Sequence, residues 1–213
     1  MGADPDRTTA IPVDGVTLEG ILEVPADATG LVAFAHGSGS SRKSPRNNFV
    51  ADVLRERGLG TLLFDLLTEE EDRVRENRFD VPLLTDRLIA ATAWLRAQDA
   101  TESLDVGYFG SSTGAAAALR AAARPGVDVR AVVSRGGRVD LAADAFADVR
   151  APTLLIVGGN DTEVLERNRT ASDRLAGETE LHVVEDAGHL FQGEGELEAV
   201  AAAAADWFDE HLQ

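Results

Sequence analysis

The chain has 213 residues, of which 44% are hydrophobic and 27% charged, and its formal net charge is −17 at pH 7. A chain of this length can bury roughly 70% of its extended surface, so we expect one globular domain over residues 1–213, and its acidity disfavours nucleic acid as a partner. It has no cysteine for disulfides or thiolate zinc sites, no run of about eighteen apolar residues, and no signal-peptide pattern in residues 1–9, so we expect a cytoplasmic protein without membrane contact.

Hydrophobic patterns divide the chain into alternating strands and helices. Segments 8–13 and 16–24 predict two strands joined at Asp14-Gly15, a strong hairpin signal. The expected later strands are 31–35, 60–65, 104–109, 129–134, 154–157 and 181–184, and the expected helices are 47–58, 82–98, 112–124, 163–177 and 196–212, with a short segment at 141–146. This alternation predicts an α/β fold: a mainly parallel sheet of about eight strands, an N-terminal antiparallel hairpin, and helices on both faces.

Two segments shape the expected pocket. Residues 134–152 are too few to hold a large cap domain, so the pocket should be open. Residues 66–80 are charged and irregular, and either they cover the pocket in part or they form a solvated surface loop.

The most informative motif is Tyr-Phe-Gly-Ser-Ser-Thr-Gly at 108–114. An apolar strand pattern precedes it and an alanine-rich helix pattern follows, which is the context of a nucleophile elbow. The glycines at 110 and 114 permit the tight turn because they have no Cβ. We therefore predict Ser112 as a nucleophile, with a plain Gly/Ser turn between core elements as the alternative.

A nucleophilic serine needs a base, and the chain has four histidines. His36 follows an early strand, His182 alternates within a strand, and His211 lies near the carboxyl terminus, where we expect fraying. His189 lies in the loop after the strand at 181–184, from which an imidazole can swing over a neighbouring strand. We predict His189 as the base, with a structural surface histidine as the alternative.

The expected acid lies between these two residues in the chain. Asp161 follows the buried strand at 154–157, where its carboxylate could accept the imidazole N–H of the base and fix the tautomer. A helix N-cap is the alternative role for Asp161. Glu185 and Asp186 are nearer to His189 in sequence, but proximity in sequence does not aim a side chain.

Acyl transfer also needs an oxyanion hole of two backbone N–H groups. We predict the N–H of Thr113, at the start of a helix, and the N–H of Ser38, in the glycine-rich loop after the first parallel strand. His36 and Gly37 begin that loop and are candidate substrate contacts. A phosphate-binding loop would need the pattern Gly-x-x-x-x-Gly-Lys-Ser/Thr, which residues 36–41 lack.

These motifs fall in the order nucleophile, acid, base that α/β-hydrolases use. With His36-Gly37, residues 110–114, residues 158–161 and Gly188-His189 in family order, the chain resembles small α/β-hydrolases of the dienelactone-hydrolase-like group over nearly its whole length. Through residues 133–141 it is also similar to hydrolases found fused to phosphoribosyltransferases. The resemblance implies the α/β-hydrolase fold and a hydrolytic reaction. Dienelactone hydrolases proper use a cysteine nucleophile, which this chain lacks, so dienelactone itself is not implied.

Basic residues cluster in two loops at the expected mouth of the site. They are Arg42, Lys43, Arg46, Arg135 and Arg138. Carboxyl ends of parallel strands are where open α/β sheets bind ligands, and a guanidinium suits a carboxylate or phosphate. We therefore list the four arginines as candidate substrate contacts for an anionic ester; pairing with local acids such as Asp140 and Asp144 is the alternative.

Together these residues predict a serine hydrolase that cleaves small carboxylic esters through an acyl-enzyme, without metal or cofactor. A thioesterase, lactonase, amidase or acyltransferase would use the same groups. A catalytically silent module that binds a small acid and assists a partner enzyme is the alternative from another class. The expected partner is a small-molecule ester, and the sequence does not specify the acyl and alcohol parts or the oligomeric state.

The acidic surface has two explanations. Lys43 is the only lysine, and an acidic, lysine-poor, alanine-rich chain is typical of a salt-adapted protein, whose carboxylates repel one another when counterions are scarce. A GC-rich genome, which favours arginine and alanine codons, would give a similar composition.

Overall fold

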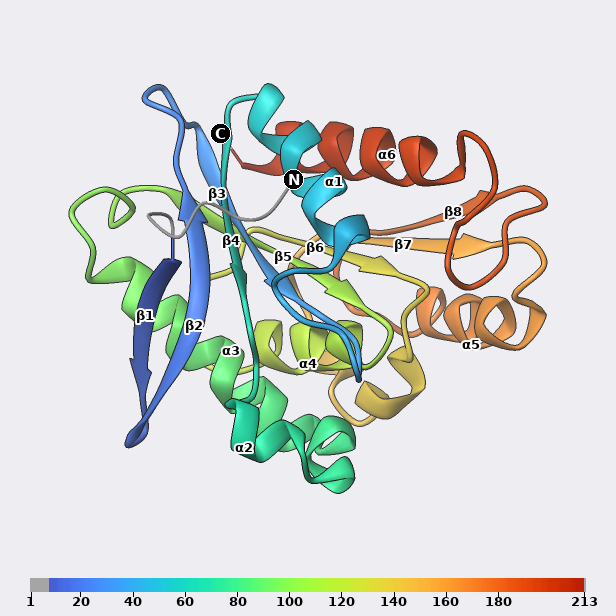
Figure 1. The fold of residues 1–213 in the computed structure, drawn as a ribbon. Helices are drawn as coiled ribbons and strands as arrows, with labels where there is room; N and C mark the ends of the chain where they lie inside the picture. The colour runs from blue at the N-terminus through green and yellow to red at the C-terminus, as the bar shows by residue number, and fades with distance from the viewer. Residues whose placement is uncertain (1–7, 213) are drawn as a thin grey trace.

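The computed structural model describes residues 8–212 and contains an eight-stranded sheet in the order β1-β2-β4-β3-β5-β6-β7-β8 (Figure 1). The strands are β1 (Thr8–Val13), β2 (Val16–Glu23), β3 (Gly30–Ala35), β4 (Leu59–Phe64), β5 (Asp105–Ser111), β6 (Ala131–Arg135), β7 (Thr153–Gly158) and β8 (Thr179–Val184). The helices are α1 (Pro45–Glu56), α2 (Glu69–Asp72), α3 (Val81–Arg96), α4 (Thr113–Ala122), α5 (Thr162–Ser172) and α6 (Glu196–His211).

The expected N-terminal hairpin is confirmed. β1 and β2 pair antiparallel in a register that ends with Val13 opposite Val16, and β2 pairs antiparallel with β4. Asp14 and Gly15 both have positive φ, at 43° and 83°, as a two-residue turn that follows the strand twist requires. All remaining strand pairs are parallel, so their carboxyl ends meet at one edge of the sheet.

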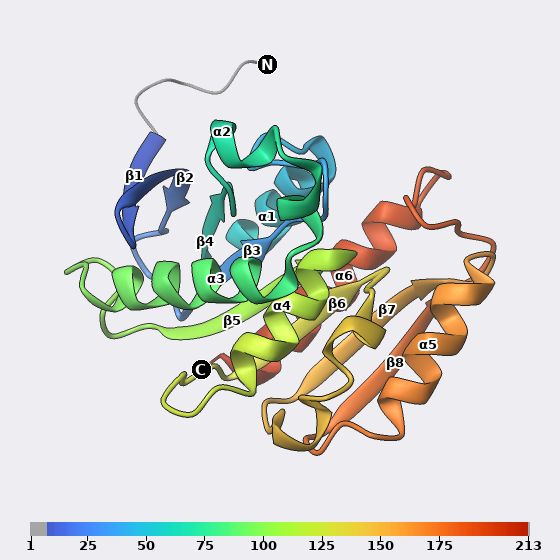
Figure 2. The same cartoon turned by 90° about the horizontal axis from the view of Figure 1, so that it is seen from below.

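Helices cover both faces of the sheet, as predicted. Helices α1 and α6 lie on one face, and α3, α4 and α5 lie on the other (Figures 1 and 2). β3 shows the cause, because all six of its residues are buried and alternate residues enter different cores: Val32 and Phe34 pack with α1 and α6, and Leu31 and Ala33 pack with α3 and α4. Within residues 8–212, no helix is both long and apolar enough to cross a membrane.

The segment between β6 and β7 holds only two short 3₁₀ helices, η3 (Val139–Ala142) and η4 (Phe146–Asp148), and no cap domain. Residues 66–80 are more regular than the sequence indicates, since they form α2 and the 3₁₀ helix η2 (Arg75–Phe79). A capping box begins α2: the Thr68 hydroxyl accepts the N–H of Glu71, and the Glu71 carboxylate accepts the N–H of Thr68. Local polar bonds therefore help to order α2 and η2, neither of which contains a buried residue.

Candidate active site

Ser112 occupies a sharp turn between β5 and α4. Its φ of 50° and ψ of −119° are strained for a residue with a side chain. A Cβ at Gly114 would collide with the carbonyl oxygen of Ala35, and one at Gly110 would lie 2.5 Å from the Cα of Ala115, so only glycine fits at either position. The N–H of Ser112 donates to the carbonyl of Arg135 at 3.2 Å, which fixes the turn against β6.

His189 and Asp161 come from loops that follow neighbouring parallel strands. Asp161 follows β7, His189 follows β8, and Asp161 Oδ2 lies 2.6 Å from His189 Nδ1. The Asp161 side chain is 16% exposed and that of His189 is 41% exposed. Asp161 stands at the N-cap position of α5, yet its side chain caps no backbone N–H. Its carboxylate instead accepts a bond from His189 Nδ1, which leaves Nε2 as the nitrogen available to a substrate or nucleophile.

A turn at residues 135–138 connects the serine to this pair. The N–H of Arg138 donates to the carbonyl of Ser112 at 3.0 Å, and a Cβ at Gly136 would lie 3.4 Å from Cε1 and Nδ1 of His189. Among the residues that the structure describes, no hydrogen bond joins Ser112 to His189. One short turn thus contacts both the elbow and the imidazole.

The two predicted oxyanion donors differ in their present partners. The N–H of Ser38 donates to the Thr113 hydroxyl oxygen at 2.9 Å, which ties the loop after β3 to the first residue of α4. None of the hydrogen bonds between described residues uses the backbone N–H of Thr113. That N–H is one of the donors that a helix leaves without a partner in its first turn, so it is available to an anion.

His36 has a structural place in this loop. Its Nε2 accepts the N–H of Leu66 at 3.1 Å, so Nδ1 carries the proton and donates to the carbonyl of Gly37 at 2.9 Å. Burial lowers the pKa of His36 and keeps the ring neutral. With both ring nitrogens bonded to backbone, His36 joins the loop after β3 to the segment after β4, and it also lines a cavity of about 420 Å³.

The remaining histidines lie outside this arrangement. His182 lies within β8, and His211 is the last residue of α6. The ring of His211 packs against Trp207 at 4.5 Å between centroids, so the expected fraying at this position is wrong.

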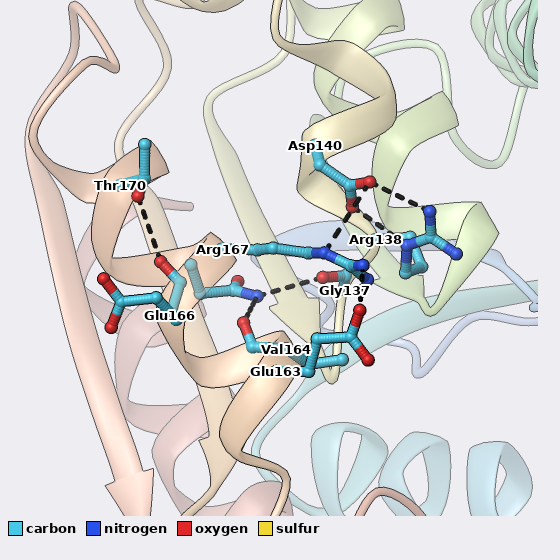
Figure 3. A network of polar contacts seen from close by, with 9 residues as sticks. Gly137, Arg138, Asp140, Glu163, Val164, Glu166, Arg167 and Thr170 are labelled. Carbon is cyan, nitrogen blue, oxygen red and sulfur yellow. Dashed lines mark hydrogen bonds and ion pairs between the residues drawn. The ribbon is translucent and has the colours of Figure 1, made fainter.

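The candidate arginines fall into two groups. Arg42 pairs with Glu19 and Asp65, and Arg138 donates two hydrogen bonds of 2.9 Å to Asp140, which also lies near Arg167 (Figure 3). The Arg138 guanidinium holds the pKa of Asp140 below its usual range. Pairing with a local acid therefore applies to these two arginines, although the partner of Asp144 is Arg120.

Arg46 and Arg135 form the second group and have no acidic partner among residues 8–212. Arg135 is the last residue of the buried strand β6 and is 8% exposed. Arg46 lies half-buried in the first turn of α1. Lys43 is exposed.

Comparison with known proteins identifies the family of the chain. Residues 28–206 match the model of an alpha/beta hydrolase domain family, so the chain belongs to the α/β-hydrolases. It is similar to the crystal structure of a dienelactone hydrolase from Anabaena variabilis, with 51% identity, a TM-score of 0.94 and coverage of 97% of each chain. Est1E from Butyrivibrio proteoclasticus shares the fold, with a TM-score of 0.81 and 17% identity over 95% of this chain and 98% of that one.

A longer relative is also similar to the chain. A Mycobacterium tuberculosis (strain H37Rv) protein provisionally named a phosphoribosyl transferase is 57% identical over 213 residues, which is 99% of this chain and 48% of that protein. The chain thus spans about half the length of the curated relatives it matches. The recognised resemblance to dienelactone-hydrolase-like proteins and to sequences associated with phosphoribosyltransferases is confirmed.

Proposed function

We propose that this chain is a serine hydrolase that cleaves small carboxylic esters through an acyl-enzyme. The observation that carries the proposal is the 2.6 Å hydrogen bond between Asp161 and His189 beside the strained elbow of Ser112. A carboxylate on Nδ1 orients the imidazole, stabilises the imidazolium and leaves Nε2 to accept the serine proton. A module that only binds a ligand has no use for this pair.

In the proposed reaction the Ser112 hydroxyl oxygen attacks the ester carbonyl while His189 Nε2 takes its proton. The tetrahedral oxyanion is stabilised by the N–H groups of Thr113 and Ser38. His189 then gives its proton to the leaving alcohol oxygen as the ester C–O bond breaks, and the acyl group remains on Ser112. A water molecule then attacks the acyl carbon while His189 takes its proton; the acid leaves as the bond from the acyl carbon to the Ser112 oxygen breaks, and His189 returns the proton to that oxygen.

The Ser38 amide requires one adjustment in this scheme. Its N–H is bonded to the Thr113 hydroxyl at 2.9 Å, so a substrate oxygen must share that N–H or replace the hydroxyl. Because the Thr113 hydroxyl hydrogen has no acceptor among the described residues, it can turn toward the same oxyanion.

Fluorophosphonate labelling tests the proposal and separates it from a silent module. The wild type should be labelled at Ser112, and Ser112→Ala should lose the label and reduce ester turnover by on the order of a thousandfold or more. Ser111→Ala is the matched control, since Ser111 is buried and bonded to Asn47. A label retained in Ser112→Ala, or no label on the wild type, would overturn the proposal.

Turnover assays of the wild-type protein distinguish among the classes of enzyme that share these catalytic groups. Turnover of esters of increasing chain length should be compared with that of matched thioesters, amides and unsaturated lactones, the last because the 51%-identical relative is named a dienelactone hydrolase. Product transfer to an added alcohol would reveal an acyltransferase. If thioesters, amides or lactones are turned over faster than every carboxylic ester, the corresponding activity replaces esterase activity as the proposed function.

A further inference from the structure

Arg46 and Arg135 are two neighbouring arginines beside the elbow that lack acidic partners. The Nη1 atom of Arg135 and the Nε atom of Arg46 are each sealed from solvent without a hydrogen-bond acceptor. Among residues 8–212, no ion pair involves either guanidinium. Arg135 is 8% exposed, and Arg46, in the first turn of α1, is half-buried.

Strand register and one helix contact bring the two arginines together. Ser111 and Arg135 are paired across β5 and β6, one residue before the elbow. Ser111 and Arg135 lie two residues after Phe109 and Val133, and alternate residues of a strand share a face. Phe109 and Val133 face the core formed with α1 and α6. The Ser111 hydroxyl donates to Asn47 Oδ1 at 3.4 Å, and Asn47 is the residue after Arg46. Burial first, and then the charge of Arg46, lowers the pKa of Arg135 to about 10.

This arrangement differs from that of most other arginines in the described part of the chain. Most other arginines in the described part of the molecule form ion pairs with carboxylates. The chain has 37 acidic residues against 20 basic ones, so acids are plentiful. Two adjacent cations that are partly or wholly removed from water destabilise the fold unless an anion compensates them. Their lack of a protein partner leaves that compensation to a bound anion.

The location of the pair connects it with the reaction. The carbonyl of Arg135 accepts the N–H of Ser112 at 3.2 Å, so the backbone of Arg135 touches the nucleophile. A guanidinium presents parallel donors that match a carboxylate. Resting on the proposed ester hydrolysis, we propose that Arg46 and Arg135 bind a carboxylate carried by the substrate, so that the preferred substrates are half-esters of dicarboxylic acids.

Turnover of two matched esters tests this inference. Monoethyl succinate carries the carboxylate, and ethyl levulinate replaces it with a neutral methyl ketone. At constant ionic strength, pH-stat titration should give the wild type a kcat/KM roughly ten- to hundredfold higher for monoethyl succinate, the range that charge-assisted hydrogen bonds supply. Arg46→Gln and Arg135→Gln should each lose most of that preference, because the cleavage of monoethyl succinate slows more than that of ethyl levulinate.

Arg57→Gln is the control for a change of net charge. Arg57 lies at the other end of α1, is paired with Asp206 and Asp209, and should keep the wild-type preference. Equal kcat/KM for both esters in the wild type would overturn the inference and leave ester hydrolysis standing. Because that comparison needs no variant, and because Arg46 is only half-buried, the test survives a failure of Arg135→Gln to fold.

A binding measurement tests the anion site without relying on turnover. Calorimetric titration of Ser112→Ala should detect succinate but not neutral succinamide, and adding Arg135→Gln or Arg46→Gln should abolish succinate binding. If the wild type cleaves neither ester while succinate binds through the arginines, the anion site stands and the ester hydrolase proposal fails. Succinate that does not bind, or that binds unchanged in the arginine variants, overturns the anion site whatever the hydrolysis shows.

Discussion

The carboxylate of Asp161 lies 2.6 Å from His189 Nδ1, although 28 residues separate the two in the chain. Adjacent parallel strands β7 and β8 make this contact possible, because each residue follows the carboxyl end of its own strand. The two side chains form one hydrogen-bonded unit, so in the proposed hydrolase their contributions to the rate should be shared rather than additive.

We therefore expect strongly non-additive losses on substitution. Asp161→Asn and His189→Ala should each reduce kcat for ester hydrolysis by on the order of a thousandfold, and the double variant should be little worse than the worse single one. Asp186→Asn is the matched control, since Asp186 lies in the loop of His189 and asparagine tolerates its φ of 59°. Losses that multiply in the double variant, or an equal loss in Asp186→Asn, would refute the assignment.

Thr113 is expected to position the oxyanion loop. Thr113→Val removes the acceptor of the Ser38 N–H, so the loop loses its bond to α4 and kcat should fall roughly tenfold, the equivalent of about 1.4 kcal/mol. Thr113→Ser keeps the hydroxyl and should restore kcat, with KM little changed in either variant. A melting temperature for each variant controls for folding. Equal kcat in the valine and serine variants would show that the hydroxyl has no part in the reaction.

The sequence predicts the placement of Ser112 and Asp161 because each follows a strand that is almost wholly buried, whereas β8, which precedes His189, is only partly buried. Residues 153–158 and 30–35 are continuous apolar runs, and such runs mark parallel strands whose carboxyl ends share one edge. The elbow adds glycines whose positions admit no side chain. Local patterns of this kind reveal where Ser112 and Asp161 stand.

The partners of the charged side chains are harder to predict. Arg135 and Arg138 are only three residues apart. Arg135 ends β6 and shares the face of Val133 toward α1, whereas Arg138 lies in the following turn and binds Asp140. Strand alternation could have placed Arg135 on the face of Val133, but no pattern in the sequence reveals that Arg46 lies near it. The bond from Ser38 to Thr113 spans 75 residues and likewise depends on the path of two loops.

His36 should make stability depend on pH. Burial lowers its pKa in the folded protein, so below its ordinary pKa of about 6.5 the unfolded chain binds a proton that the folded chain does not. The free energy of unfolding should therefore fall as pH decreases through 6.5, by at most about 1.4 kcal/mol per pH unit for this one group.

Urea denaturation between pH 7.5 and pH 5 measures this effect. In His36→Gln, the amide oxygen can still accept the N–H of Leu66, but no proton is taken up. Its free energy of unfolding should change less with pH than that of the wild type, while other titrating groups contribute equally to both. Parallel curves for the two proteins would show that His36 does not carry the dependence.

Salt should stabilise the fold. Repulsion among the carboxylates of a chain with net charge −17 opposes compaction, and the Debye length falls from about 10 Å at 0.1 M to about 3 Å at 1 M ionic strength. Screening also weakens exposed ion pairs such as Arg57 with Asp206, but exposed pairs of this kind contribute little to the stability of the fold. The excess of unpaired negative charge should dominate, so the melting temperature should rise between dilute buffer and 1 M KCl. Choline chloride should produce the same rise if the cause is screening rather than potassium binding, and a melting temperature that does not increase in either salt would leave genome composition as the explanation of the acidity.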